Sequence, residues 1–165
     1  MKLRNLKKVD APLMLEWMHD ADVVKDLQAN FASKTLADCE AFIEGSQSSE
    51  TDLNLAIVDD TDEYMGTVSL KHIDRENKTA EFAITVRSKA MGKGISKYGM
   101  QEIIRIGLNE YGLEAIYWCV SIENKRAVRF YEKGEGLRTN QVPKEILNKY
   151  DEKLLEKLIW YVVKK

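Results

Sequence analysis

Cysteine, proline and long apolar runs are all scarce in this chain. Two cysteines, without CxxC spacing and without a histidine cluster or histidine partner nearby, argue against both a metal site and a catalytic thiol. No apolar run approaches the roughly twenty residues that a membrane span needs, and no charged-then-apolar N-terminus indicates a secretory signal. We therefore expect no metal, no membrane association and a cytoplasmic location.

Excess charge of either sign is also missing. The 25 Lys and Arg residues nearly balance the 27 Asp and Glu residues, for a net charge of −2. Nucleic acid is not expected as a partner, because the sequence provides no broad basic field. The 165 residues, without repeat or linker, fit one domain spanning residues 1–165.

The N-terminal third has the periodicity of helices. Apolar residues recur three and four positions apart, which predicts helices over residues 9–19, 22–28 and 35–46. Asp10, ahead of Pro12, is the expected cap of the first helix. Thr35 and Asp38 have the spacing of a capping box for the third.

Beyond residue 52 the period changes to that of strands. Alternating side chains and Asp-rich turns predict three antiparallel strands in succession, over residues 53–57, 64–73 and 81–86. A buried strand over residues 114–121 follows a helix, so the crossover rule places it parallel to the strand that ends at Val86. A last strand is expected over residues 158–163. The predicted fold class is α+β, with a mixed, mostly antiparallel sheet flanked by helices.

The most informative segment is the turn over residues 86–96, which joins a strand to a long amphipathic helix. Gly92 and Gly94 permit positive φ and a close approach of the backbone to a ligand. The free N–H groups of the first helical turn favour an anion. The turn has neither the Gly-Lys-Ser/Thr ending of a nucleoside-triphosphate loop nor a complete dinucleotide fingerprint, and a tight connection without ligand remains an alternative.

About thirty residues further on, Asn124-x-x-Ala127-x-x-x-Tyr131 follows the buried strand. These three side chains share one face of a short helix. Strand, glycine turn, helix, strand and this last helix together resemble the GCN5-related N-acetyltransferases (GNAT family). The resemblance covers the chain from Leu3 to about Leu137.

The resemblance implies acetyl-coenzyme A as cosubstrate and a sheet whose fourth and fifth strands splay apart. It implies that backbone groups of the fourth strand follow the pantetheine, that the glycine turn binds the pyrophosphate, and that the last helix completes the site. The coenzyme-binding residues implied in this way are Ile84, Thr85, Val86, Met91, Gly92, Lys93, Gly94, Ile95, Ser96, Asn124 and Ala127. Met91 and Ser96 depart from the family pattern Arg/Gln-x-x-Gly-x-Gly/Ala.

The resemblance also implies two catalytic residues. Tyr131 would give a proton to the departing sulfur, and Glu81 would draw the proton from the amine through water. A core tyrosine and a solvent-facing glutamate are the structural alternatives for these two positions. His72, on the preceding strand, is a rival base.

The acceptor region, from Trp17 to Phe31, combines aromatic and acidic side chains. It resembles the branch with ribosomal-protein alanine and nucleotide-linked amino-sugar acetyltransferases. We expect a small primary amine, an amino sugar before others. A protein N-terminus, a polyamine, and a non-catalytic acyl-coenzyme A-binding module remain alternatives. The last strand could pair across a homodimer.

Overall fold

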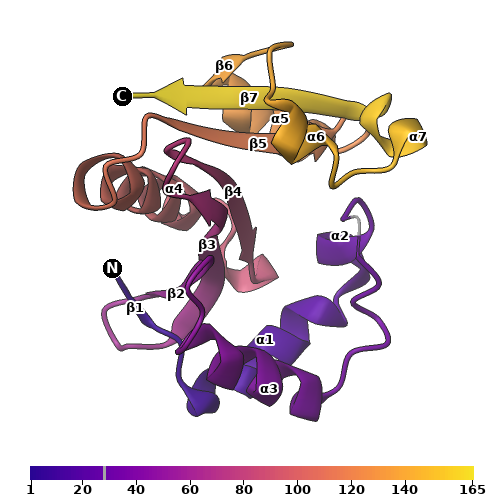
Figure 1. Cartoon of the computed structure of the whole chain (residues 1–165). Coiled ribbons are helices and arrows are strands. Elements are labelled where there is room, and N and C mark those ends of the chain that lie inside the picture. Colours follow the sequence, from indigo (N-terminus) through magenta and orange to yellow (C-terminus); the bar gives the residue numbers. More distant parts are fainter. Residues whose placement is uncertain (28) are drawn as a thin grey trace.

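The computed structural model describes residues 1–27 and 29–165, which form a seven-stranded sheet with helices on both faces (Figure 1). The strands are β1 (Lys2–Asn5), β2 (Leu53–Val58), β3 (Tyr64–Asp74), β4 (Thr79–Val86), β5 (Ala115–Ser121), β6 (Leu137–Arg138) and β7 (Leu158–Lys164). The helices are α1 (Ala11–Met18), α2 (Ala21–Val24), α3 (Leu36–Ser46), α4 (Ile95–Arg105), α5 (Lys125–Glu132), α6 (Lys144–Leu147) and α7 (Glu152–Leu155). Two 3-10 turns, η1 (Lys8–Asp10) and η2 (Ser88–Ala90), and a π-helical turn, η3 (Ile106–Glu110), complete the elements.

The sheet order is β1-β2-β3-β4-β5-β7-β6. β1 to β4 pair antiparallel, and β4 pairs parallel with β5. The predicted α+β fold with a mixed sheet is therefore confirmed. In the described part of the chain the β4–β5 pairing ends at Glu81 and Tyr117, so the later residues of the two strands diverge, as the resemblance implied.

The larger core lies between the sheet and α4. Ile95, Gly99 and Ile103 share the buried side of α4, which is amphipathic as predicted. A side chain on Gly99 would collide with Ile57 of β2, so glycine lets the helix lie close to the sheet. This packing fixes where α4 begins, next to the end of β4.

A second core lies on the opposite face of β2 and β3, beneath α1 and α3. Met14, Trp17 and Ile43 are buried there against Tyr64 of β3. A third, smaller cluster covers the same side of β5 and β7, where Ile146 of α6 packs near Trp160.

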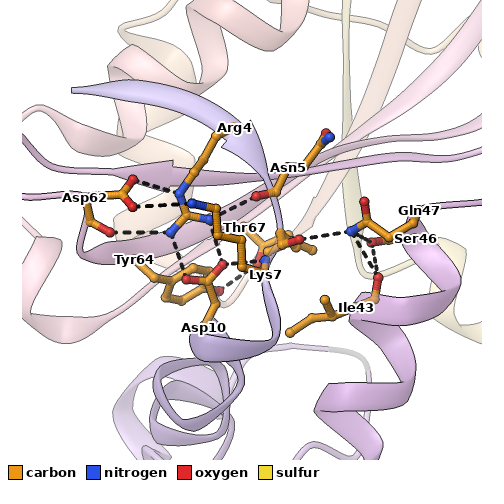
Figure 2. Close-up of polar contacts among 11 residues, drawn as sticks. Arg4, Asn5, Lys7, Asp10, Ile43, Ser46, Gln47, Asp62, Tyr64 and Thr67 are labelled. Carbon is orange, nitrogen blue, oxygen red and sulfur yellow. Dashed lines mark hydrogen bonds and ion pairs between the residues drawn. The ribbon is translucent and has the colours of Figure 1, made fainter.

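Arg4 of β1 ties the first helix to the β2–β3 turn (Figure 2). Its guanidinium donates to both carboxylate oxygens of Asp10, at 2.8 and 2.9 Å, and to Asp62 at 2.8 Å. The Asp10 carboxylate also accepts the Lys7 N–H at 2.8 Å. Asp10 precedes α1 as predicted, but its side chain does not cap that helix, because Arg4 and the Lys7 amide occupy it.

Of three further predicted features, one is confirmed and two differ from the structure. The predicted helix 22–28 is only α2, and its last residue, Gln28, lies outside the described residues. The capping box of α3 is confirmed, since Asp38 N–H donates to Thr35 Oγ1 and Thr35 N–H to Asp38 Oδ2. The last strand is not a complete edge, because β7 lies between β5 and β6 and pairs with β6 at Tyr161 and Val162; the homodimer stays a prediction. Among the described helices, none combines the length and apolar character of a membrane span.

Candidate active site

The turn between β4 and α4 has the geometry that its glycines predicted. Gly92 and Gly94 have φ of 75° and 77°, and a Cβ on either would meet no atom within 4 Å. Conformation rather than space therefore requires glycine here. Tyr98 N–H donates to the Gly94 carbonyl at 3.1 Å, so the amides ahead of Tyr98 in the first turn of α4 have no such partner inside the helix. A helix start with free amides of this kind is suited to an anion.

A cavity of about 480 Å³ lies beside this turn, lined by the end of β4, the start of α4, helix α5 and residues of α2; we call it the coenzyme cavity. It brings together the predicted residues Ile84, Thr85, Val86, Met91, Gly92, Gly94, Ile95, Ser96, Asn124, Ala127 and Tyr131. Lys93 is exposed in the turn and does not line this cavity. Lys97, a few positions along α4, does.

Two basic side chains on this cavity were not predicted. Lys97 follows Ser96 in the first turn of α4, and Arg126 lies between Asn124 and Ala127 on α5. The Arg126 guanidinium contacts the Met91 sulfur, with 2.6 Å between Nη1 and Sδ. Arg126 and Met91 thus approach each other across the cavity mouth. An elongated anionic ligand such as acetyl-coenzyme A fits this combination of glycine turn, basic side chains and opened sheet.

Asn124 begins α5 rather than only lining the cavity. Its Oδ1 accepts the Ala127 N–H at 3.2 Å, which is the N-cap bond of the helix. The Asn124 side chain therefore has its nitrogen left for a ligand. Ala127, one turn on, is small and partly buried against the main core.

Tyr131 lies deep in the coenzyme cavity and is only 8% exposed. Its ring packs among Phe82, Trp118 and Tyr161, with centroids 6.5, 5.7 and 5.4 Å away. Burial raises the pKa of its hydroxyl above the ordinary tyrosine value. The hydroxyl therefore stays protonated throughout the physiological range and is held rigidly by its aromatic neighbours.

Glu81 lies on β4 beyond both described cavities. It is 5% exposed, and Tyr150 donates to its Oε1 at 2.8 Å. His72 Nδ1 contacts its Oε2, and Lys149 lies 3.6 Å from the same oxygen. Glu81 is thus a buried carboxylate held by three side chains, of which His72 and Lys149 are 45% and 40% exposed. The two candidate bases named from the sequence are in direct contact.

A second cavity of about 210 Å³ lies on the α1 and α3 side of β3 and β4. Trp17 and Phe31, from the predicted acceptor region, line it, whereas Asp22 and Asp26 line the coenzyme cavity. Ile84 and Thr85 belong to both cavities. An acceptor in the second cavity would therefore meet the coenzyme at the end of β4.

Comparison with known proteins supports this geometry. The family model described as an acetyltransferase (GNAT) domain matches residues 1–135. This chain belongs to the GNAT acetyltransferases. An uncharacterized N-acetyltransferase, p20, from Bacillus licheniformis is 28% identical over 130 residues, which cover 77% of this chain and 73% of that protein.

Solved structures show the same fold. Spermidine N-acetyltransferase from Vibrio cholerae, in complex with CoA and spermine, superposes with a TM-score of 0.81 at 16% identity, covering 99% of this chain and 94% of that one. Another structure of the V. cholerae enzyme, with manganese ions, gives a TM-score of 0.71 at 17% identity over 99% and 91% of the two chains. At this identity they establish the fold, with its parallel β4–β5 pair, and the family membership identifies the chain as an N-acetyltransferase.

Proposed function

We propose that this GNAT protein transfers the acetyl group of acetyl-coenzyme A to the primary amine of a small molecule. The observation that carries the proposal is the position of Tyr131, whose side chain lines the coenzyme cavity near the point where β4 and β5 diverge. When bound, the coenzyme supplies an activated acetyl thioester. Everything else is supplied by this chain's own groups.

The coenzyme would be held mainly by backbone groups. The amides from Gly92 to Ser96 would bind the pyrophosphate, with Lys97 and Arg126 near it. The residues from Ile84 to Val86 would follow the pantetheine, and a backbone N–H of β4 would polarise the acetyl carbonyl. Lys93 would contribute its amide rather than its charge.

Proton transfer requires two further groups. Tyr131 would donate its hydroxyl proton to the sulfur as the carbon–sulfur bond breaks. Glu81 would receive the proton that the amine loses as the carbon–nitrogen bond forms, with His72 between them as relay or as the base itself. The contact of Glu81 with His72 supports a joint assignment.

An amino sugar is the first acceptor to test, since aromatic and hydrogen-bonding side chains line the second cavity. A polyamine is the second candidate, supported by Asp22 and Asp26 on the coenzyme cavity and by the activity named for the V. cholerae neighbours. A protein N-terminus and a non-catalytic acyl-coenzyme A-binding module are the remaining alternatives.

Two measurements on the purified protein test the proposal. Calorimetry with acetyl-coenzyme A tests the site, and thiol release with amino sugars, polyamines and peptides tests the chemistry. Activity with peptides alone would refute a small-molecule acceptor. Binding without turnover on any amine would favour the non-catalytic module.

A further inference from the structure

The second cavity has one apolar wall. Met14, Trp17 and Met18 of α1, with Phe31 and Phe42, form it. The Trp17 and Phe31 rings meet edge to face with centroids 5.0 Å apart. At about 210 Å³ the cavity is smaller than the ~300–1,000 Å³ of pockets for drug-sized ligands. It fits the body of a small acceptor with apolar or ring character.

The opposite wall presents hydrogen-bond donors, beginning with Thr67 of β3. Trp17 Nε1 donates to Tyr64 Oη at 2.9 Å. Tyr64 Oη lies 2.6 Å from Thr67 Oγ1 (Figure 2). Indole N–H can only donate, so the buried Tyr64 hydroxyl accepts from it. Among the described residues the Tyr64 proton has no acceptor other than Thr67 Oγ1, so we assign Tyr64 as the donor to Thr67. The Thr67 hydroxyl is then left to donate, and Thr67 lines the cavity.

Asn54 of β2 is oriented in a similar way. Ser69 Oγ donates to Asn54 Oδ1 at 2.6 Å, which occupies the amide oxygen. The amide nitrogen acts only as a donor, and it is left to donate to a ligand in the cavity that Asn54 and Ser69 line. Two neutral donors, on Thr67 and Asn54, thus face the same space from adjacent strands.

Two lysines add positive charge. Lys34 and Lys71 line the cavity, and within residues 1–27 and 29–165 neither forms an ion pair with a carboxylate. One acidic residue, Asp38, lines it as well. Its carboxylate accepts the N–H of Thr35 at 2.8 Å and the Thr35 hydroxyl at 3.1 Å, so it serves the cap of α3.

We propose that the acceptor amine also carries an acidic group, a carboxylate or a phosphate, which Lys71, Lys34 and the donors of Thr67 and Asn54 bind in the second cavity. The proposal rests on the proposed function, because the acceptor must be acetylated at the shared end of β4. A donor-lined wall with two lysines attracts an anion and repels a polycation. The preferred acceptors are therefore small amino acids with an apolar side chain or phosphorylated amino sugars, rather than spermidine.

Matched pairs of acceptors test this on the purified protein with acetyl-coenzyme A. The pairs are phenylalanine with phenethylamine, and glucosamine 6-phosphate with glucosamine. Spermidine, a polycation without an acidic group, is the comparison for the opposite charge. We expect the acidic member of at least one pair to have a kcat/KM about tenfold or more above its partner, as loss of a charge-assisted bond implies. The pair that responds identifies carboxylate or phosphate. Equal rates within both pairs, or preference for spermidine, would overturn the proposal.

Lysine variants locate the effect. Lys71→Gln and Lys34→Gln should raise the KM for the acidic acceptor about tenfold and leave the KM for the partner without an acidic group and for acetyl-coenzyme A unchanged. Lys144→Gln, on the exposed surface of α6, is the matched control. An unchanged KM for the acidic acceptor in both variants would overturn the assignment. Turnover of no amine at all would instead defeat the proposed function, so the two failures are distinguishable.

Discussion

Tyr150 and Glu81 are joined by a hydrogen bond of 2.8 Å that spans 69 positions of the sequence. The phenol donates to Oε1, while His72 contacts Oε2. Tyr150 lies just after helix α6, so the segment that follows this helix contacts a carboxylate on β4. In the proposed function, His72 is the group that passes the proton of the acceptor to Glu81.

Glu81→Gln tests that route. The amide cannot take a proton, so we expect kcat to fall about a hundredfold and the acidic limb of the pH–rate profile to flatten. Stopped assays of thiol release from pH 5 to 10 measure both. An unchanged profile would remove Glu81 from the chemistry and leave His72 as the candidate base.

Tyr150→Phe is the matched control for Glu81. It removes one donor to the carboxylate but keeps the carboxylate itself. Because the carboxylate is retained, the acidic limb of the pH–rate profile should persist in this variant. If the acidic limb is also flattened in Tyr150→Phe, the contact between Tyr150 and Glu81 supports the fold of the site and does not take part in proton transfer.

Local patterns allowed much of this protein to be predicted. The glycine turn, the capping box of α3 and the face shared by Ala127 and Tyr131 each depend on residues close in sequence, and each was correctly placed on its element. The fold class followed from the strand-and-helix order.

What could not be predicted depends on contacts between distant segments. Nothing local to Glu81 indicates that Tyr150 and Lys149 enclose it. Lys34 and Lys71 come from separate elements and share a cavity only after α3 packs on the sheet. The insertion of β7 between β5 and β6 likewise depends on which strand competes best for β5, which periodicity cannot show.

Tyr131→Phe should reduce kcat about a hundredfold or more, because the hydroxyl proton is lost, while the affinity for acetyl-coenzyme A hardly changes. The ring packing with Trp118 is kept. Initial rates and calorimetry separate the two quantities. Tyr161→Phe, in the same aromatic cluster but outside the coenzyme cavity, is the control and should stay active. Full activity of the Tyr131 variant would end its assignment as proton donor.

Cys119 should resist alkylation at neutral pH. Burial raises the pKa of its thiol to about 11, so the reactive thiolate is scarce below that pH. Labelling of the folded protein with iodoacetamide, followed by mass spectrometry, should be slow at pH 7 and accelerate about tenfold for each pH unit up to about 10. Labelling in denaturant is the control for accessibility. Rapid labelling of the folded protein at pH 7 would contradict the buried environment of this thiol.

Gly94→Ala should weaken coenzyme binding through the backbone alone. At φ of 77° an alanine costs about 1–2 kcal/mol, although its methyl group would meet nothing. We expect the Kd for acetyl-coenzyme A to rise as the turn relaxes toward negative φ. Gly45→Ala, in helix α3 with open space around it, is the matched control and should leave that Kd unchanged. Equal affinity in the Gly94 variant would show that the turn is not the pyrophosphate site.

Arg87→Gln should destabilise the whole site, because Arg87 connects three elements at the end of β4. Its guanidinium is 7% exposed, donates to both Glu16 oxygens at 2.7 and 3.0 Å, and reaches Glu63 and the Tyr64 carbonyl at 2.8 and 2.9 Å. The variant loses hydrogen bonds to the carboxylates of Glu16 and Glu63 and removes the donor to the Tyr64 carbonyl. We expect this loss to lower the free energy of unfolding by about 1–3 kcal/mol.

Thermal unfolding provides the measurement for Arg87→Gln, with a fall in Tm of about 2–4 °C expected for each kcal/mol lost. The exposed pair of Arg105 and Glu102 supplies the control. Arg105→Gln should change the stability by about 0.5 kcal/mol or less, since exposed ion pairs are screened by solvent. Because Glu16 belongs to α1 and Arg87 leads into the glycine turn, the Arg87 variant should also raise the KM for both substrates. A variant as stable as the Arg105 control would show that α1 is held against β4 by its apolar contacts alone.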